Sequence, residues 1–164
     1  MSSYKIISSF AIPQEIADTS TTQLCPLGLI INAQDDTYGV GEFIYLKGVA
    51  STAVGSWVTF NSDDYSTALL AANAIAPVAV AMSANVAGQY GWYQISGKAV
   101  GKALTGYVDN ALVYATATAG SVDDAVVVGD RVKNALGASA VGTPSSGLAE
   151  FEIQRPWMDD ASAA

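Results

Sequence analysis

The stretch from Pro77 to Val100 constrains the fold of this 164-residue chain more than any other. It holds two apolar runs, PVAVAM and GWYQISGKAV, rich in β-branched and aromatic residues. Asn85 to Gly91 separates them, with two glycines and little that would hold a regular element. This pattern predicts a β-hairpin with a short irregular connection. We expect Trp92, Tyr93 and Ile95 to lie in a hydrophobic core.

Strand-like segments recur on both sides of this hairpin, separated every 8–12 residues by turns rich in Gly, Asp, Asn and Ser. The clearest are 27–32, 42–49, 56–60, 112–118, 125–128 and 148–154. Eight to ten short strands at this spacing predict an all-β fold, a small antiparallel β-barrel or a sandwich of the jelly-roll kind. No internal repeat and no shift in composition divides the chain, so one β domain is expected.

One segment, Tyr65 to Ile75, leaves two alternatives open. Its Leu and Ala content favours a helix, and Ala68, Ala72 and Ile75 fall near helical spacing. Pro77 would end that helix. A strand followed by a bulged loop fits the same residues, so the fold contains at most one short helix.

The ends of the chain differ from its middle. Residues 13–25 are rich in Ser, Thr and Gln, which predicts an extended N-terminal arm over residues 1–25. The β domain then spans 26–156, because Arg155 and Pro156 are expected to stop the last strand. Residues 157–164 form a C-terminal tail. Trp157 in this tail either folds back onto the rim of the domain or anchors a neighbouring subunit.

Charge and composition exclude several classes of partner. The net charge is −8, from 15 acidic and 7 scattered basic residues, which argues against nucleic acid and against an anionic membrane surface. No apolar run approaches the roughly 18 residues of a membrane span. No apolar segment precedes Pro13, so a secretory signal is not expected. The single Cys25 allows no intrachain disulfide and is expected to be buried; a reducing cytoplasm fits this cysteine usage.

The residue types needed for most catalysis are missing. Without histidine, a Ser-His-Asp or Cys-His arrangement has no base, and zinc or iron sites lack nitrogen ligands. No Ser-x-x-Lys and no phosphate-binding glycine motif occurs. We therefore predict no enzyme, no catalytic, cofactor-binding or metal-binding residue, and no cofactor.

Acid pairs and aromatic residues suggest weaker alternatives. The acid pairs are Asp35-Asp36, Asp63-Asp64, Asp123-Asp124 and Asp159-Asp160. Each pair has oxygen ligands for Ca²⁺, and two pairs across a sugar bond would suit glycoside hydrolysis, but none has EF-hand spacing. We interpret them as exposed turns. Tyr90, Trp92 and Tyr93 suit a sugar-stacking platform or a hot spot for a partner. For Trp92 and Ile95 we favour core and sheet-face packing, and Trp57 and Phe60 are likewise expected in the core.

Several segments together resemble a known family. They are GVGEFIYLKGVAS, VGSWVTF, PVAVAMSANVAGQYGWYQISGKAV and VYATATAGSVDDAVVVGDRV. Between Leu27 and Pro156 the chain resembles the head decoration, or cement, proteins of tailed bacteriophages. The resemblance implies a β-barrel or β-tulip-like fold, commonly a homotrimer, that bridges capsid subunits against the pressure of packaged DNA.

This resemblance sets the functional expectations. The protein would be a virion structural protein, made in the bacterial cytoplasm, that binds the major capsid protein on the exterior of the expanded capsid. The arm, Ser2 to Gln23, and the tail around Trp157 would make the contacts, so a chain lacking residues 2–20 would fold but not bind. The alternatives are another phage β-protein (tail tube, connector or fibre-associated) and a carbohydrate- or Ca²⁺-binding β-module.

Overall fold

The computed structural model describes residues 3–9 and 11–159. In this part of the chain all regular structure is β, no helix occurs, and every pair of named strands is antiparallel, so the predicted fold class is confirmed. The strands are β1 (Lys5–Ile6), β2 (Thr19–Ser20), β3 (Ile30–Asp35), β4 (Gly39–Lys47), β5 (Trp57–Phe60), β6 (Thr67–Leu69), β7 (Ile75–Ala81), β8 (Tyr90–Lys102), β9 (Leu112–Ala115), β10 (Val122–Asp123), β11 (Arg131–Gly137) and β12 (Leu148–Asp159).

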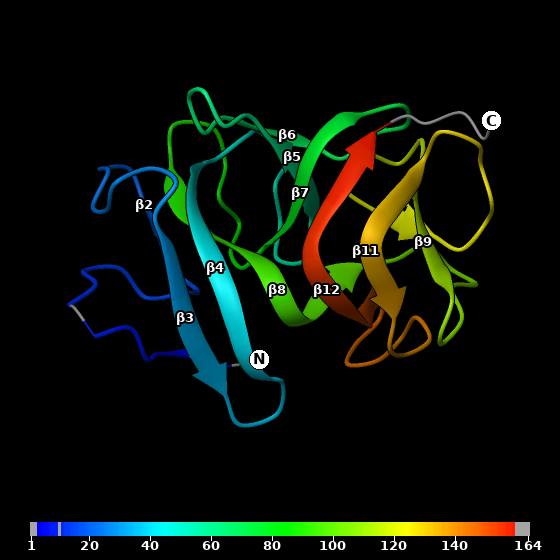
Figure 1. Cartoon of the computed structure of the whole chain (residues 1–164), viewed down its shortest axis with the longest axis horizontal. Helices are drawn as coiled ribbons and strands as arrows, with labels where there is room; N and C mark the ends of the chain where they lie inside the picture. The colour runs from blue at the N-terminus through cyan, green and yellow to red at the C-terminus, as the bar shows by residue number, and fades with distance from the viewer. Residues whose placement is uncertain (1–2, 10, 160–164) are drawn as a thin grey trace.

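The long strand β8 joins two halves of one bent sheet. Residues 90–96 of β8 pair with β4, whereas residues 96–102 pair with β12. Figure 1 shows β3 and β4 on one side, β9, β11 and β12 on the other, and β8 running between them. The change of partner falls at Gly97, where φ is +100°. A Cβ at Gly97 would lie 2.7 Å from the carbonyl oxygen of Val40, so the bend requires glycine.

The predicted hairpin is present, but its first strand has several partners. Val80 and Ala81 of β7 pair with Gln94 and Tyr93 of β8. Residues 78–80 of β7 also pair with β5, and residues 75–77 pair with β12. The twelve-stranded sheet therefore branches around β7, β8 and β12, and within the described residues it does not close into a barrel.

Aromatic residues fill a separate core in each half. In the half that contains β12, the ring of Trp57 meets the ring of Phe151 edge to face, with centroids 4.9 Å apart. In the half that contains β4, Tyr45 packs against Trp92, also at 4.9 Å. All four side chains are fully buried, which confirms the core roles predicted for Trp57 and Trp92. Such ring pairs add about 0.5–1.5 kcal/mol each beyond the area they bury.

The N-terminal segment packs against its own sheet. Gln14, Ile16 and Cys25 are buried there, as expected for Cys25. The hydroxyl of Tyr45 donates to Gln14 Oε1 at 2.6 Å, and Trp92 Nε1 donates to the backbone carbonyl of Gln14 at 3.0 Å. The segment expected to act as an arm thus covers the aromatic core of this half, and removing residues 2–20 would uncover that core. Ser2 and Phe10 of this stretch lie outside the described residues.

The prediction that the last strand stops at Arg155 is wrong. Between the pairs Lys133–Trp157 and Ala135–Ile153, β12 advances four residues while β11 advances two, so β12 contains a bulge. Arg155 has φ +48° there. Beyond the bulge β12 pairs with β7 as far as Asp159, and Met158 is fully buried. The first three residues of the predicted tail are therefore strand, and residues 160–164 lie outside the described part.

Residues 65–75 form a strand followed by a loop, the second of the two predicted alternatives, and not a helix. β6 occupies Thr67–Leu69, and a loop leads to the start of β7 at Ile75. Tyr65 and Asn73 have φ of +56° and +59°, which a right-handed helix does not allow. The N–H of Leu70 donates to the Trp57 carbonyl at 2.9 Å, because the segment extends the pairing with β5.

Candidate interaction surface

The first acid pair closes a turn. Asp35 is buried at the end of β3, whereas Asp36 is exposed. Burial raises the pKa of the Asp35 carboxyl, but hydrogen bonds from the N–H groups of Thr37 (2.8 Å), Tyr38 (3.0 Å) and Ser3 (2.6 Å) outweigh this effect, and the pKa lies below its usual value. The predicted turn is confirmed, but Asp35 is buried in it and not exposed as predicted.

The other acid pairs are also engaged locally. Asp64 Oδ1 accepts from the N–H and the hydroxyl of Ser66, and Asp124 Oδ2 accepts from the N–H of Val108 at 3.0 Å. Asp159 forms an ion pair with Lys133, and its neighbour Asp160 lies outside the described residues. Across residues 3–9 and 11–159, no three Asp, Glu, Cys or His side chains gather in a way that would hold a metal ion.

The aromatic residues considered for sugar stacking do not form an exposed platform. Trp92 and Tyr93 have no exposed surface, and Tyr90 stacks on Tyr45 with ring centroids 6.4 Å apart. The hydroxyl of Tyr93 accepts a hydrogen bond from Asn85 Nδ2 at 3.0 Å. Trp92 is therefore a core residue, as predicted, and Tyr93 is fully buried as well.

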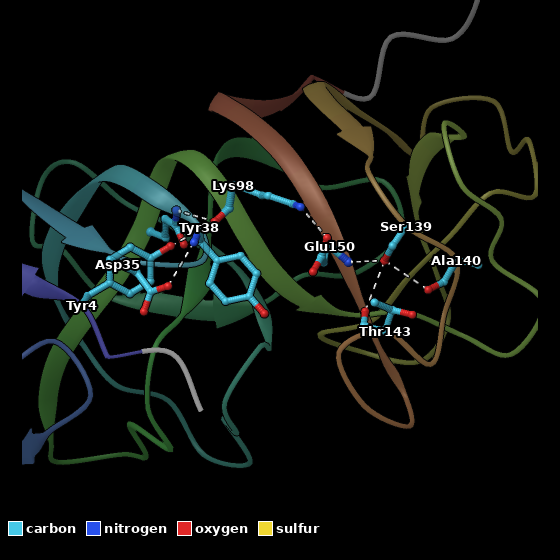
Figure 2. Close-up of polar contacts among 9 residues, drawn as sticks. Tyr4, Asp35, Tyr38, Lys98, Ser139, Ala140, Thr143 and Glu150 are labelled. Carbon is cyan, nitrogen blue, oxygen red and sulfur yellow. Dashed lines mark hydrogen bonds and ion pairs between the residues drawn. The ribbon is translucent and has the colours of Figure 1, made fainter.

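A cluster of polar side chains around Lys98 links the two halves of the sheet. Figure 2 shows the side chain of Lys98 on β8 extending to Glu150 on β12, and the Nζ–Oε2 distance is 2.5 Å. Lys98 Nζ also lies 5.9 Å from the centre of the Tyr38 ring, and the Lys98 carbonyl accepts from the Tyr4 hydroxyl at 3.1 Å. Burial raises the pKa of Tyr4 to about 12. The cluster ties β8 to its neighbours.

The hydroxyl of Ser139 organises the loop between β11 and β12, residues 138–147. Ser139 Oγ accepts from the Glu150 N–H at 2.9 Å and lies 3.2 Å from the carbonyl oxygens of Ala140 and Thr143 (Figure 2). All three of these partners are backbone atoms, two in the loop of Ser139 and one in β12. We therefore interpret Ser139 as a structural residue.

A groove opens beside Trp157. The indole is 45% exposed and stands opposite Pro77 in the β12–β7 register. The groove has a volume of about 370 Å³, and its walls include Phe60, Arg155 and Pro156. A second hollow of about 490 Å³ shares Phe60, Pro77 and Trp157 with it. We call the surface formed by these five residues the Trp157 groove. An exposed tryptophan among rigid apolar neighbours is typical of a binding hot spot.

A run of exposed valines lies nearby. The side chains of Val126, Val127 and Val128 are 75%, 47% and 61% exposed, and we call these three residues the valine knob. The prediction of a strand over 125–128 is wrong, because β10 ends at Asp123 and β11 begins at Arg131. High β-propensity led to that prediction, but the run has no strand partner. Three successive exposed β-branched residues are unusual on a free surface.

The knob and the groove occupy neighbouring parts of the surface. Lys133 on β11 pairs with Trp157 on β12. Lys133 and Asp159 also line a hollow of about 290 Å³, and all three valines of the knob line the same hollow. Figure 1 places β7, β12 and β11 side by side along this part of the sheet. The chain therefore presents two adjoining apolar features with one ion pair between them.

The outer strands of the sheet offer little for strand addition. Among the described residues, the short strands β1, β2 and β10 have two residues each, and β6 has three. Short edge strands are a common defence against unwanted strand pairing. Recognition through side chains, such as those of the knob and the groove, is thus favoured over strand addition.

Comparison with protein-family models, curated proteins and solved structures returned no match. In the described residues there is no helix with the length and hydropathy to span a membrane. A functional interpretation therefore depends on the surface of the molecule and on the sequence resemblance.

Proposed function

We propose that this protein is a non-enzymatic virion structural protein that binds the outside of an expanded phage capsid. It stabilises the capsid by bridging subunits of the major capsid protein. The observation that carries the proposal is the pair of exposed apolar features, the valine knob and the Trp157 groove, on a rigid all-β frame. The resemblance to decoration proteins between Leu27 and Pro156 indicates that the partner is a capsid protein.

The stabilisation works by linkage. A protein that binds only the expanded lattice lowers the free energy of that state and leaves the unexpanded state unchanged. Each Å² of apolar surface that is buried at a contact contributes about 25 cal/mol to the binding free energy. Because a capsid offers many equivalent sites, modest affinity at each site adds to a large total.

The charge pattern and the engaged acids support a protein partner. A net charge of −8 opposes binding to packaged DNA and to anionic lipid. The acids described above close turns or pair with lysines, which suits a structural role better than catalysis. The proposal further includes a homotrimer on the exterior of the virion, assembled in the bacterial cytoplasm.

The experiment is sedimentation with phage heads. Expanded and unexpanded heads of the phage that encodes this chain, prepared without it, are mixed with the purified protein and pelleted. We expect the protein to pellet with expanded heads and to remain in solution with unexpanded heads. Pelleting with isolated tails, or with neither kind of head, would contradict the proposal.

A further inference from the structure

We propose that the chain self-associates by placing the valine knob of one copy in the Trp157 groove of another. This inference rests on the self-association contained in the proposed function, but it does not depend on capsid binding. It names the two surfaces that meet and the residues that carry the contact.

The knob is presented by a fixed loop. Asp130, buried at its C-terminal end, accepts from the Asn73 N–H at 2.7 Å and donates its own N–H to the Val127 carbonyl at 3.2 Å. At the other end, Asp124 holds the loop against Val108. Valine has a single side-chain torsion and loses little entropy on burial. The knob is therefore already shaped for insertion into an apolar site.

The groove is built from side chains that need little reorganisation. Pro77 and Pro156 fix the backbone on both sides of Trp157, and Met158 beside them is fully buried. Phe60 and Trp157 supply the aromatic walls. A volume of about 370 Å³ admits aliphatic side chains of the size found on the knob.

Acidic residues beside the knob complement the cation of the groove. Arg155 is the charged residue in the wall of the groove; its side chain is 63% exposed, and its Nε lies 3.4 Å from Glu42 Oε2. The knob follows Asp123 and Asp124, and Asp109 is exposed beside Val108. Arg131 and Lys133 also border the knob, and Lys133 is paired with Asp159. When the valines of a second copy enter the groove, the carboxylates of their loop thus come near the guanidinium.

The valine knob and the Trp157 groove are adjacent, which suits a closed, symmetric oligomer. The groove lies along β7 and β12, and the loop of the knob leads into the neighbouring strand β11. A symmetry axis close to both surfaces therefore lets each copy give a knob and receive one. The exposed valines and Trp157 are then buried in every copy. This removes from solvent the most exposed apolar run on the described surface.

The test is the native mass of the protein alone, by light scattering during gel filtration. We compare the unaltered chain with Val127→Asp, Trp157→Ala and the control Val40→Asp. Val40 is 55% exposed on β4 and lines neither the groove nor the hollow beside the knob. We expect the unaltered chain and the control to be oligomers. Each of the other variants should dissociate at least about 30-fold more readily, the effect of losing a hot spot. Thermal unfolding of each variant confirms that it is folded.

Mixing the two dissociated variants tests the pairing itself. Val127→Asp retains an intact groove and Trp157→Ala retains an intact knob, so an equimolar mixture should form mixed oligomers. A mixture that stays monomeric, or an unaltered chain that is a monomer, would overturn the inference. A monomer that still pellets with expanded heads would contradict the proposed homotrimer but leave the proposed capsid binding intact. An oligomer that ignores heads would contradict only the proposed capsid binding.

Discussion

The Asp35 carboxylate receives three backbone N–H groups at the end of β3, and one of them comes from Ser3 near the N-terminus. A single side chain therefore closes the β3–β4 turn and ties the start of the chain to it. The charged form is stabilised in the folded protein, since its pKa is lowered there. The stability that it supplies is consequently present above the unfolded-state pKa and is lost as the pH falls through the folded-state pKa.

Replacing Asp35 by Asn should therefore destabilise the protein in a pH-dependent way. We expect a loss of about 1–2 kcal/mol near pH 7, because the charge-assisted hydrogen bonds are weakened. The difference from the unaltered chain should shrink as the pH falls through the folded-state pKa of Asp35, where the unaltered carboxyl also becomes protonated. Urea unfolding of both chains at neutral pH and over a descending acid series measures this difference, and a difference that stays constant over the whole series would contradict the role of the charge.

Among the elements, β8 determines the shape of the molecule because it changes partner at Gly97. Substituting alanine at Gly97 should cost about 3 kcal/mol, since the added Cβ meets backbone atoms of Val40 and Gly41 and φ is +100°. The matched control is Gly88→Ala, where φ is +79° and no atom lies within 4 Å of the added Cβ. The control should cost about 1 kcal/mol. Equal losses in denaturant unfolding would show that close approach at Gly97 does not matter.

The N-terminal segment is the second element whose role can be measured. Deleting residues 2–20 removes Gln14 and Ile16 from the cover of Tyr45 and Trp92. We expect the shortened chain to lose cooperative thermal unfolding, because the aromatic core of that half meets water. A shortened chain with an unchanged melting temperature would instead support the free arm that the sequence suggested.

The elements that the sequence predicted well are those whose pattern is local. The apolar runs around Trp92, the turn at Asp35 and the strand that begins at Leu148 follow from alternation and turn residues. The continuation of β12 past Arg155 was missed because a bulge, which only its partners β7 and β11 define, lets the strand resume after a proline. The valine knob was taken for a strand because propensity does not reveal whether a partner strand is present.

For the candidate site, the sequence singled out Trp157 but not its surroundings. It left open whether Trp157 folds back or anchors a neighbour. The register with Pro77 and the 45% exposure of Trp157 now place it on the sheet with one face toward solvent. Phe60 was expected in the core, yet it also lines the groove. The groove joins residues about eighty positions apart in the chain, so no local pattern predicts it.

At the scale of the whole molecule, stability and recognition are separated. The aromatic cores stabilise each half and the Lys98–Glu150 pair links β8 to β12, while the exposed valines contribute little to the isolated chain. Substituting an exposed valine should therefore change assembly and leave the unfolding free energy within about 0.5 kcal/mol. Denaturant unfolding of monomeric Val127→Asp checks this separation, and a loss comparable to that of Gly97→Ala would contradict it.

The most direct measurement of the central claim is the amount of protein bound to expanded and to unexpanded heads as its concentration is raised. The proposed function predicts saturable binding to expanded heads, a fixed number of copies per capsid, and no binding to unexpanded heads. It also predicts that bound heads resist a higher temperature before releasing DNA, because binding stabilises the expanded state. Equal binding to both kinds of head, or binding without any gain in head stability, would contradict a decoration function.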